Sequence, residues 1–116
     1  MTYTIGQTEE RPWGRWTVLD VGPAYTVKRI DVRPHARLSL QRHRHRDEEW
    51  IVVGGIGYAT LEGQRRLVAQ GDRVRVLRGQ AHRLEATADP LVVIEVQLGT
   101  CDEDDIERLE DDHGRA

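Results

Sequence analysis

The stretch SLQRHRHRDEEW, residues 39–50, alternates histidine with arginine and then gives three acidic residues in a row. Histidine and carboxylate side chains this close together could bind a metal ion, whereas the arginines favour a basic patch for nucleic acid. A third interpretation is a charged strand edge with no chemical role. Which of the three interpretations applies depends on the secondary structure around this stretch.

Strand geometry separates the histidines from the arginines. If residues 37–45 form an extended strand, successive side chains point to opposite faces. His43 and His45 then share a face with Gln41, and the arginines between them point the other way. The two histidines lie about 7 Å apart along such a strand, from twice the rise per residue, so both can reach one cation. A basic patch is disfavoured because the two residue types do not share a face.

Further ligands are expected from a following carboxylate and from His82. Glu48 and Glu49 come a few residues later, and His82 follows a Gly-containing turn in GDRVRVLRGQAH. Three imidazoles and one carboxylate suit a divalent transition metal rather than Mg or Ca, which prefer oxygen ligands. Zn is the first choice, with Mn, Fe, Co or Ni as alternatives. The competing interpretation is a pair of solvated histidines on a charged strand.

The rest of the chain predicts an all-β domain. Between Trp16 and Leu98, short apolar runs such as YTVKRIDV and LVVIEVQL alternate with turn signals that contain Gly, Pro or Asp. This spacing is typical of an antiparallel barrel or sandwich. Helical periodicity is absent until residues 102–110, DEDDIERLE, where acidic residues suit the start of a short helix. We predict a single domain over residues 1–116.

Composition restricts the classes of function. The chain has 17 Lys and Arg against 20 Asp and Glu, a net charge of −3, so a general nucleic-acid binder is not expected. No stretch approaches the roughly 20 apolar residues of a membrane span, and the N-terminus lacks the pattern of a signal peptide. The single cysteine, Cys101, fits a reducing compartment. These features predict a cytoplasmic protein that contacts neither nucleic acid nor membrane.

Several blocks of the sequence resemble one enzyme family. HRHRDE with WIVVGG, and GDRVRVLRGQAH, resemble the two motifs of the cupin superfamily. RPWG, RLSLQRHRHRDEEWIVVGG, HRLEA and EDDIERLEDDHGR are similar to the type II mannose-6-phosphate isomerase family, whose cupin domain also ends the bifunctional guanylyltransferase/isomerases. The resemblance, over residues 11–115, implies a double-stranded β-helix, or jelly-roll barrel, and a homodimer. Nothing in the chain resembles a guanylyltransferase domain, so that activity is not expected.

The resemblance implies a metal-dependent sugar-phosphate isomerase. Its reaction would interconvert mannose 6-phosphate and fructose 6-phosphate, or a close sugar phosphate, for GDP-mannose and polysaccharide biosynthesis. Among the neighbouring carboxylates, Glu48 is preferred to Glu49 because the Glu-x6-Gly spacing of the family, counted from Glu48, ends on Gly55. The metal ligands implied in this way are His43, His45, Glu48 and His82.

Residues for the substrate come from the same blocks. The substrate-binding candidates are three cations and one amide that could hydrogen-bond a sugar hydroxyl, namely Arg11, Lys28, Arg29 and Gln41. The proton-transfer base stays open among three carboxylates, Glu49, Glu85 and Glu95.

The chain also departs from the family. Arg42, Arg44 and Glu49 stand where the family usually has an apolar residue and two histidines. The exact substrate is therefore open, and two other functions remain. One is a small cupin that binds a sugar or sugar phosphate without catalysis, and the other is a metal-dependent oxygenase.

Overall fold

The computed structural model describes residues 2–116. In this range the chain forms eleven β-strands and no helix, so no helical segment of the described chain can cross a membrane. The strands are β1 (Thr8–Arg11), β2 (Gly14–Gly22), β3 (Tyr25–Val32), β4 (Leu40–Arg42), β5 (Arg46–Gly54), β6 (Ile56–Leu61), β7 (Gln64–Ala69), β8 (Arg73–Val76), β9 (His82–Ala86), β10 (Leu91–Gly99) and β11 (Glu107–Glu110).

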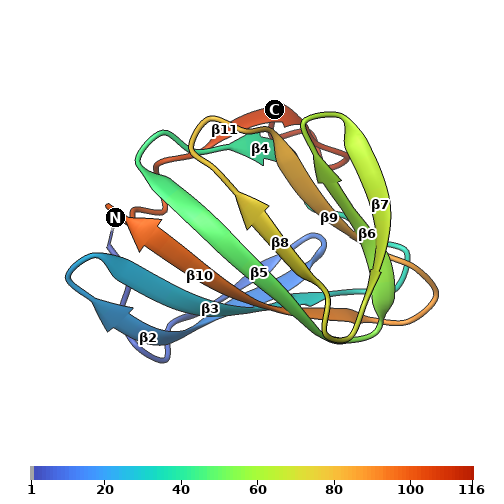
Figure 1. The fold of residues 1–116 in the computed structure, drawn as a ribbon, viewed down its shortest axis with the longest axis horizontal. Coiled ribbons are helices and arrows are strands. Elements are labelled where there is room, and N and C mark those ends of the chain that lie inside the picture. Colours follow the sequence, from blue (N-terminus) through green and yellow to red (C-terminus); the bar gives the residue numbers. More distant parts are fainter. Residues whose placement is uncertain (1) are drawn as a thin grey trace.

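The strands form two antiparallel sheets that face each other (Figure 1). The six-stranded sheet has the order β1-β2-β3-β10-β5-β8, and the five-stranded sheet has the order β11-β4-β9-β6-β7. Some consecutive strands, such as β4 and β5, lie in different sheets, whereas β2 and β3 pair within one sheet. This arrangement confirms the predicted all-β jelly-roll architecture.

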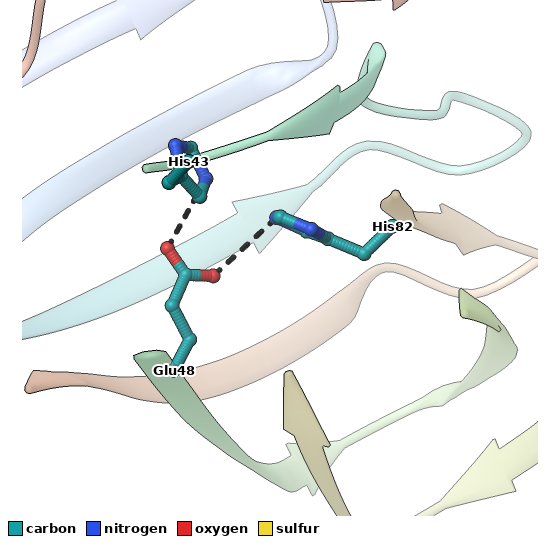
Figure 2. A group of neighbouring side chains, drawn as sticks. All are labelled: His43, Glu48 and His82. Carbon is teal, nitrogen blue, oxygen red and sulfur yellow. Dashed lines mark ion pairs between the residues drawn. The ribbon is translucent and has the colours of Figure 1, made fainter. Parts of the chain in front are cut away.

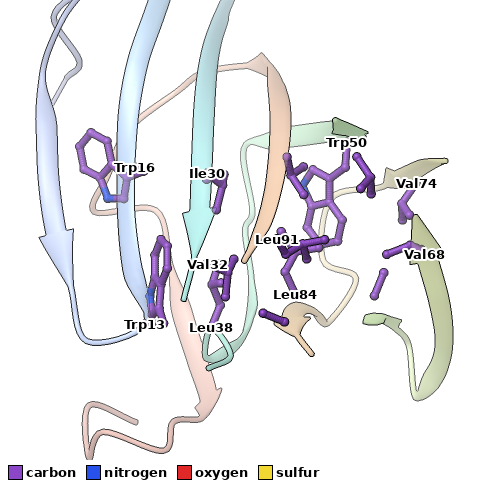
Figure 3. Packing of buried hydrophobic residues seen from close by; sticks show 14 of the residues in the cluster. Trp13, Trp16, Ile30, Val32, Leu38, Trp50, Val68, Val74, Leu84 and Leu91 are labelled. Carbon is purple, nitrogen blue, oxygen red and sulfur yellow. The ribbon is translucent and has the colours of Figure 1, made fainter. Parts of the chain in front are cut away.

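Alternating side chains fill one end of the barrel with an apolar core. In β5, Trp50 and Val52 point inward while Ile51 and Val53 are exposed, as the period of two for a strand requires. Leu84 of β9 meets them from the opposite sheet (Figure 3). Burying each such side chain contributes about 1.5–3 kcal/mol, which makes this cluster the main source of stability.

The same alternation turns polar residues inward at the other end of the barrel. Glu48 lies two residues before Trp50 and points the same way, with 1% of its surface exposed. On β10, Glu95 lies opposite Trp50 of β5 and opposite Lys28 of β3. The barrel interior thus carries ionisable groups next to its apolar core.

Gly55 ends β5 in a conformation that other residues rarely adopt. Its φ is +81°, and a Cβ atom placed there would lie 2.0 Å from the carbonyl oxygen of Pro90. Only glycine allows the chain to turn between the sheets at this point. This explains the Glu-x6-Gly spacing, since the turn fixes where β5 ends and therefore which way Glu48 points.

Two expectations about secondary structure are wrong. The predicted helix at residues 102–110 is replaced by turns and by β11. This strand pairs with β4, whose edge would be open without it. An ion pair of 2.9 Å between Arg42 Nε and Glu107 Oε2 supports this pairing. The predicted strand at 37–45 is regular only from Leu40 to Arg42, and the chain then bends at residues 44 and 45.

Candidate functional site

Three buried side chains meet where the two sheets approach each other. His43 follows β4, Glu48 lies on β5 and His82 begins β9, and one ligand atom of each lies within 4.8 Å of the others. Figure 2 shows the Glu48 carboxylate between the two rings: Oε2 is 3.3 Å from His43 Nε2, and Oε1 is 3.5 Å from His82 Nε2. Residues far apart in the sequence therefore form one cluster.

Backbone carbonyls fix the orientation of both rings. Nδ1 of His43 lies 2.6 Å from the carbonyl oxygen of Asp105, and Nδ1 of His82 lies 2.9 Å from that of Gln80. A carbonyl can only accept, so each Nδ1 carries a proton, and each Nε2 faces the Glu48 carboxylate. Burial and the nearby Arg46 guanidinium lower the pKa of His43 to about 3, which keeps this ring neutral.

Arg46 supplies a positive charge inside the cluster. Its Nε donates a 3.0 Å hydrogen bond to Glu48 Oε2, and another guanidinium nitrogen lies 3.3 Å from His43 Nε2. A third nitrogen donates to the carbonyl of Asp102, so the guanidinium is held on three sides. Burial alone would raise the pKa of Glu48, but the proximity of His82 and Arg46 lowers it to about 2.

Glu95 lies beside this cluster and is tied to it through Trp50. The indole Nε1–H is 3.2 Å from both Glu48 Oε1 and Glu95 Oε1, and Gln97 donates a 3.0 Å hydrogen bond to Glu95 Oε2. Burial, together with the negative charge of Glu48, raises the pKa of Glu95 to about 7. Two carboxylates thus share one environment with their pKa values pushed apart, an arrangement common in acid–base sites.

A pocket opens onto this arrangement from the side of the C-terminal segment. His43, Arg46 and Glu95 are buried residues of its lining, here called its inner wall, and Glu48 and His82 are not among the lining residues. Its partly exposed lining, here called its outer wall, includes charged residues of β1 and of the C-terminal segment: Arg11, Glu103, Arg108 and Arg115. An ionisable cluster therefore has access to a polar pocket that could receive a charged small molecule.

Lys28 is the most enclosed cation of this pocket. Its ammonium nitrogen lies 4.0 Å from the centre of the Trp16 ring and 4.1 Å from that of Tyr3. It donates to the Tyr3 hydroxyl at 3.0 Å and to Glu103 Oε2 at 3.2 Å. Burial lowers the pKa of Lys28, and the nearby carboxylates oppose that effect. The lysine is thus oriented on its aromatic neighbours before any ligand arrives.

The structure brings some of the predicted site residues together. His43, Glu48 and His82 form the cluster, and the predicted candidates Arg11, Lys28, Gln41 and Glu95 line the pocket. The choice of Glu48 over Glu49 agrees with this placement. Glu49 points to the outer face of β5, where Arg75 donates a hydrogen bond to it.

Four predicted residues lie outside the site, Glu49 among them. His45 is exposed, because the Asp105 carboxylate accepts the backbone N–H groups of residues 44 and 45 and holds the bend there. Glu85 pairs with a surface arginine at 3.3 Å, and Arg29 is exposed and hydrogen-bonded to Asp31. For His45, the error lies in assuming that the strand continues past Arg42.

Sequence reasoning missed Arg46, Glu103, Arg108 and Arg115. Arg46 shares the inward face of β5 with Glu48 and Trp50, so the alternation rule applied to that strand identifies it. The other three belong to the acidic C-terminal run, which carries no local signal that it covers a pocket.

The residues of the cluster fit a divalent transition metal. The Nε2 atom of His82 is buried and makes no hydrogen bond with any of the residues 2–116, as expected of a ligand atom. Two ligands about 2.1 Å from a tetrahedral zinc lie about 3.4 Å apart. The nitrogen–oxygen distances of 3.3 and 3.5 Å, each to a different oxygen of Glu48, are close to that separation. Carbonyls that orient the far side of each imidazole are typical of metal-binding histidines. Two histidines and one carboxylate would leave coordination positions open.

The chain matches a family model and several curated proteins. A family model described as mannose-6-phosphate isomerase C-terminal matches residues 2–111. The chain is 46% identical over 108 residues to the alginate biosynthesis protein AlgA of Pseudomonas aeruginosa and 42% identical over 108 residues to the mannose-1-phosphate guanylyltransferase ManC of Salmonella typhimurium. These alignments cover 91% of this chain and 22% of each relative, so the chain spans about a fifth of their length.

Solved structures agree on the fold. The capsular polysaccharide assembling protein CapF of Staphylococcus aureus superposes with a TM-score of 0.80 at 20% identity, over 90% of this chain and 34% of that one. A cupin-2 domain protein of Rhodospirillum rubrum superposes with a TM-score of 0.70 at 23% identity, over 77% of this chain and 62% of that one. The chain has the cupin fold and belongs to the mannose-6-phosphate isomerase C-terminal family.

Proposed function

We propose that the protein is a metal-dependent aldose–ketose isomerase that interconverts mannose 6-phosphate and fructose 6-phosphate, or a close sugar phosphate, in GDP-mannose and polysaccharide biosynthesis. Membership of the family supports the reaction class. The observation that carries the proposal is the adjacency of a His–Glu–His cluster and the buried carboxylate of Glu95 at one pocket.

An isomerisation of this kind moves a proton between neighbouring carbons. A base removes the proton from C2 of the aldose and returns it to C1, while the hydroxyl hydrogen shifts between the two oxygens through an enediol. Glu95 is the candidate base that lines the pocket, and hydrogen bonds from Trp50 and Gln97 hold its carboxylate in place. Each carboxylate oxygen keeps a second lone pair that could accept the carbon-bound proton.

Fixed positive charge is needed where the enediol oxygens become negative. The guanidinium of Arg46 lines the pocket and is held rigidly by Glu48 and the backbone of Asp102, so it provides such a charge without rearrangement. A divalent metal held by His43, Glu48 and His82 would supply Lewis-acid polarisation of the sugar oxygens when bound. Gln41, beside His43 in the lining, could accept or donate a hydrogen bond to a sugar hydroxyl.

The test is an assay of fructose 6-phosphate formation from mannose 6-phosphate by the purified chain. The protein is freed of metal with EDTA and loaded in turn with Zn, Mn, Co, Fe and Ni. We expect turnover that one or more metals support and that EDTA abolishes. Absence of turnover with every metal, in a protein shown to be folded and metal-loaded, would contradict the proposal.

The ligand set also favours a second candidate function. Two histidines and one carboxylate are the ligands used by non-haem Fe(II) oxygenases, and in this structure His45 does not add a third imidazole to the cluster. Oxygen uptake by the Fe(II)-loaded chain, above that of the Zn-loaded chain, would support an oxygenase. Sugar-phosphate binding with neither oxygen uptake nor isomerisation would indicate a non-catalytic binding cupin.

We also propose that the protein acts as a homodimer. The outer face of β5 exposes apolar side chains, with Ile51 at 38% and Val53 at 40% exposed, and a second copy could cover them. Light scattering of the purified chain tests this, and a monomer at every accessible concentration would contradict it.

A further inference from the structure

Three arginines gather at the outer wall of the pocket. Arg11 ends β1, Arg108 lies on β11, and Arg115 lies near the C-terminus, and all three line the pocket that reaches His43 and Glu95. They come from both ends of the chain, so their convergence is a property of the fold. Such a concentration of guanidinium groups in one wall suits an anionic ligand.

Arg108 is the arginine of this group that is least neutralised. Its Nε–H is buried and donates no hydrogen bond within the described residues. Burial and the positive charges of Arg115 and Arg11 lower the pKa of its guanidinium. Leaving a buried charged donor unpaired is costly, which suggests that the missing partner is a ligand.

The carboxylates nearest to Arg108 are committed to other partners. Asp111 accepts hydrogen bonds from the side chain and the backbone N–H of Arg115, at 2.7 and 2.8 Å. Glu103 accepts from the Tyr3 hydroxyl at 2.6 Å and from Lys28 at 3.2 Å. Neither carboxylate hydrogen-bonds to Arg108, although both raise the pKa of its guanidinium from a distance.

We propose that Arg108, with Arg11 and Arg115, forms the site that binds the phosphate group of a phosphorylated substrate. A phosphate monoester offers several acceptor oxygens and up to two negative charges, which match planar guanidinium donors. This inference rests on the proposed function only for the identity of the sugar. The arginines would recognise the phosphate dianion, whichever sugar carries it. It replaces Arg29 as a phosphate ligand, since Arg29 is exposed and bound to Asp31.

The position of this site agrees with the rest of the pocket. The lining that contains the three arginines also contains Glu95 and His43. A ligand whose phosphate lies at the outer wall therefore extends its other end towards the carboxylate and the His–Glu–His cluster. The C-terminal segment, as the source of Arg108 and Arg115, is then part of the binding site rather than only a cover for the barrel.

Phosphate binding tests the site without relying on catalysis. The probe is inorganic phosphate titrated into the full chain and followed by calorimetry. We expect Arg108→Gln to weaken binding at least ~10-fold, because a bidentate charge-assisted interaction is lost. Arg33→Gln removes the same charge from an exposed arginine that does not line the pocket, and it should change the affinity less than about twofold. Equal affinities for the wild type and for Arg108→Gln would overturn the inference.

A second measurement uses the wild-type chain, so it does not depend on whether the Arg108→Gln variant folds. In the wild-type chain, the Nε–H resonance of Arg108, assigned with the help of Arg108→Lys, should shift as phosphate is added. An unmoved resonance at saturating phosphate would also overturn the inference.

Two further ligands separate this inference from the proposed function. Mannose 6-phosphate should bind with an Arg108 dependence like that of phosphate, whereas unphosphorylated mannose should show none. Phosphate binding that depends on Arg108 in a chain without isomerase activity would support the anion site and reject the isomerase. Isomerase activity with an unchanged KM in Arg108→Gln would reject the anion site and keep the isomerase.

Discussion

Replacing Arg46 by methionine tests whether its guanidinium is the cation that balances Glu48 in the metal-free protein. Arg46 and Glu48 are 6% and 1% exposed, and Arg46 Nε lies 3.0 Å from Glu48 Oε2. Methionine keeps a similar unbranched chain but removes the charge and the donors. The carboxylate then remains buried without its guanidinium partner, and leaving one member of a buried ion pair unpaired is costly.

The size of the effect can be bounded from the carboxylate itself. Removing one partner of a buried pair costs about 3–5 kcal/mol. Glu48 can escape part of this cost by binding a proton, and protonating a carboxylate of ordinary pKa 4.5 at pH 7 costs about 3.4 kcal/mol. We therefore expect Arg46→Met to lose about 3 kcal/mol at pH 7. For a domain of this size that is about 12 °C in melting temperature.

The sign of the pH dependence follows from the same groups. In the wild type the folded pKa of Glu48 is lowered to about 2, so the ionised carboxylate contributes stability above its ordinary pKa of 4.5, and this is lost as the pH falls towards 2. In Arg46→Met the folded pKa of Glu48 should be higher than in the wild type, because His82 still opposes the effect of burial but Arg46 no longer does. The gap in stability between the two proteins should therefore narrow as the pH falls from 7 towards 4.5 and below.

The assay is thermal unfolding of both proteins in EDTA and with added zinc. Zinc should stabilise Arg46→Met more than the wild type, because the metal replaces the missing positive charge and no guanidinium competes for Glu48. Arg44→Met is the control: Arg44 is exposed two residues away, and its loss should change stability by less than about 0.5 kcal/mol. A melting temperature of Arg46→Met in EDTA equal to that of the wild type would refute this reasoning.

Three other outcomes are expected. Glu95→Gln should lower kcat for isomerisation at least ~100-fold with little change in metal content, whereas Glu49→Gln, on the outer face of β5, should stay within about twofold; equal losses would remove Glu95 as the base. Leu84→Ala, at a core position that is 1% exposed, should lose about 2–5 kcal/mol in urea unfolding, and a loss below about 1 kcal/mol would contradict the packing. A hydrogen bond from Arg42 lowers the pKa of Glu107. Burial would raise the pKa of Asp111, but hydrogen bonds from Arg115 and the backbone of His113 lower it to about 2. The stability that these two carboxylates add is therefore present above their ordinary pKa values and is lost as the pH falls towards 2. NMR signals of β11 should show this segment loosening before the barrel unfolds, and simultaneous loss would count against it.

The fold could be predicted because its signals are local. Turn residues between short apolar runs locate the strands, and alternation along β5 places Trp50 in the core and Glu48 on the same inner face. Gly55 fixes the end of that strand through its close approach to the Pro90 carbonyl. Where regular strand geometry holds, as from Arg46 to Gly54, arguments from the sequence also select the side chains that reach the interior.

His45 lies outside the cluster because a distant contact ends the regular strand before it. The Asp105 carboxylate accepts backbone N–H groups at residues 44 and 45, at 3.0 and 2.9 Å, and this bend turns His45 outward. The carbonyl of the same residue orients His43. Nothing near residue 45 in the sequence signals an acidic side chain some 60 positions later, so the alternation rule alone could not find the bend.

The acidic C-terminal run is the part of the chain whose role changes most when the structure is considered. As a sequence it suggests a solvated helix that caps the barrel. In the structure, carbonyls of Asp102 and Asp105 orient Arg46 and His43, and Glu103 positions Lys28. Several of its carboxylates pair with basic residues of the barrel, as Glu107 does with Arg42 and Glu103 with Lys28, so its composition says little about how it is solvated. This one segment orients His43 and Arg46 and also supplies Arg108 and Arg115 to the pocket lining. The His–Glu–His cluster and the pocket therefore depend on the same piece of chain, and the barrel strands alone explain neither.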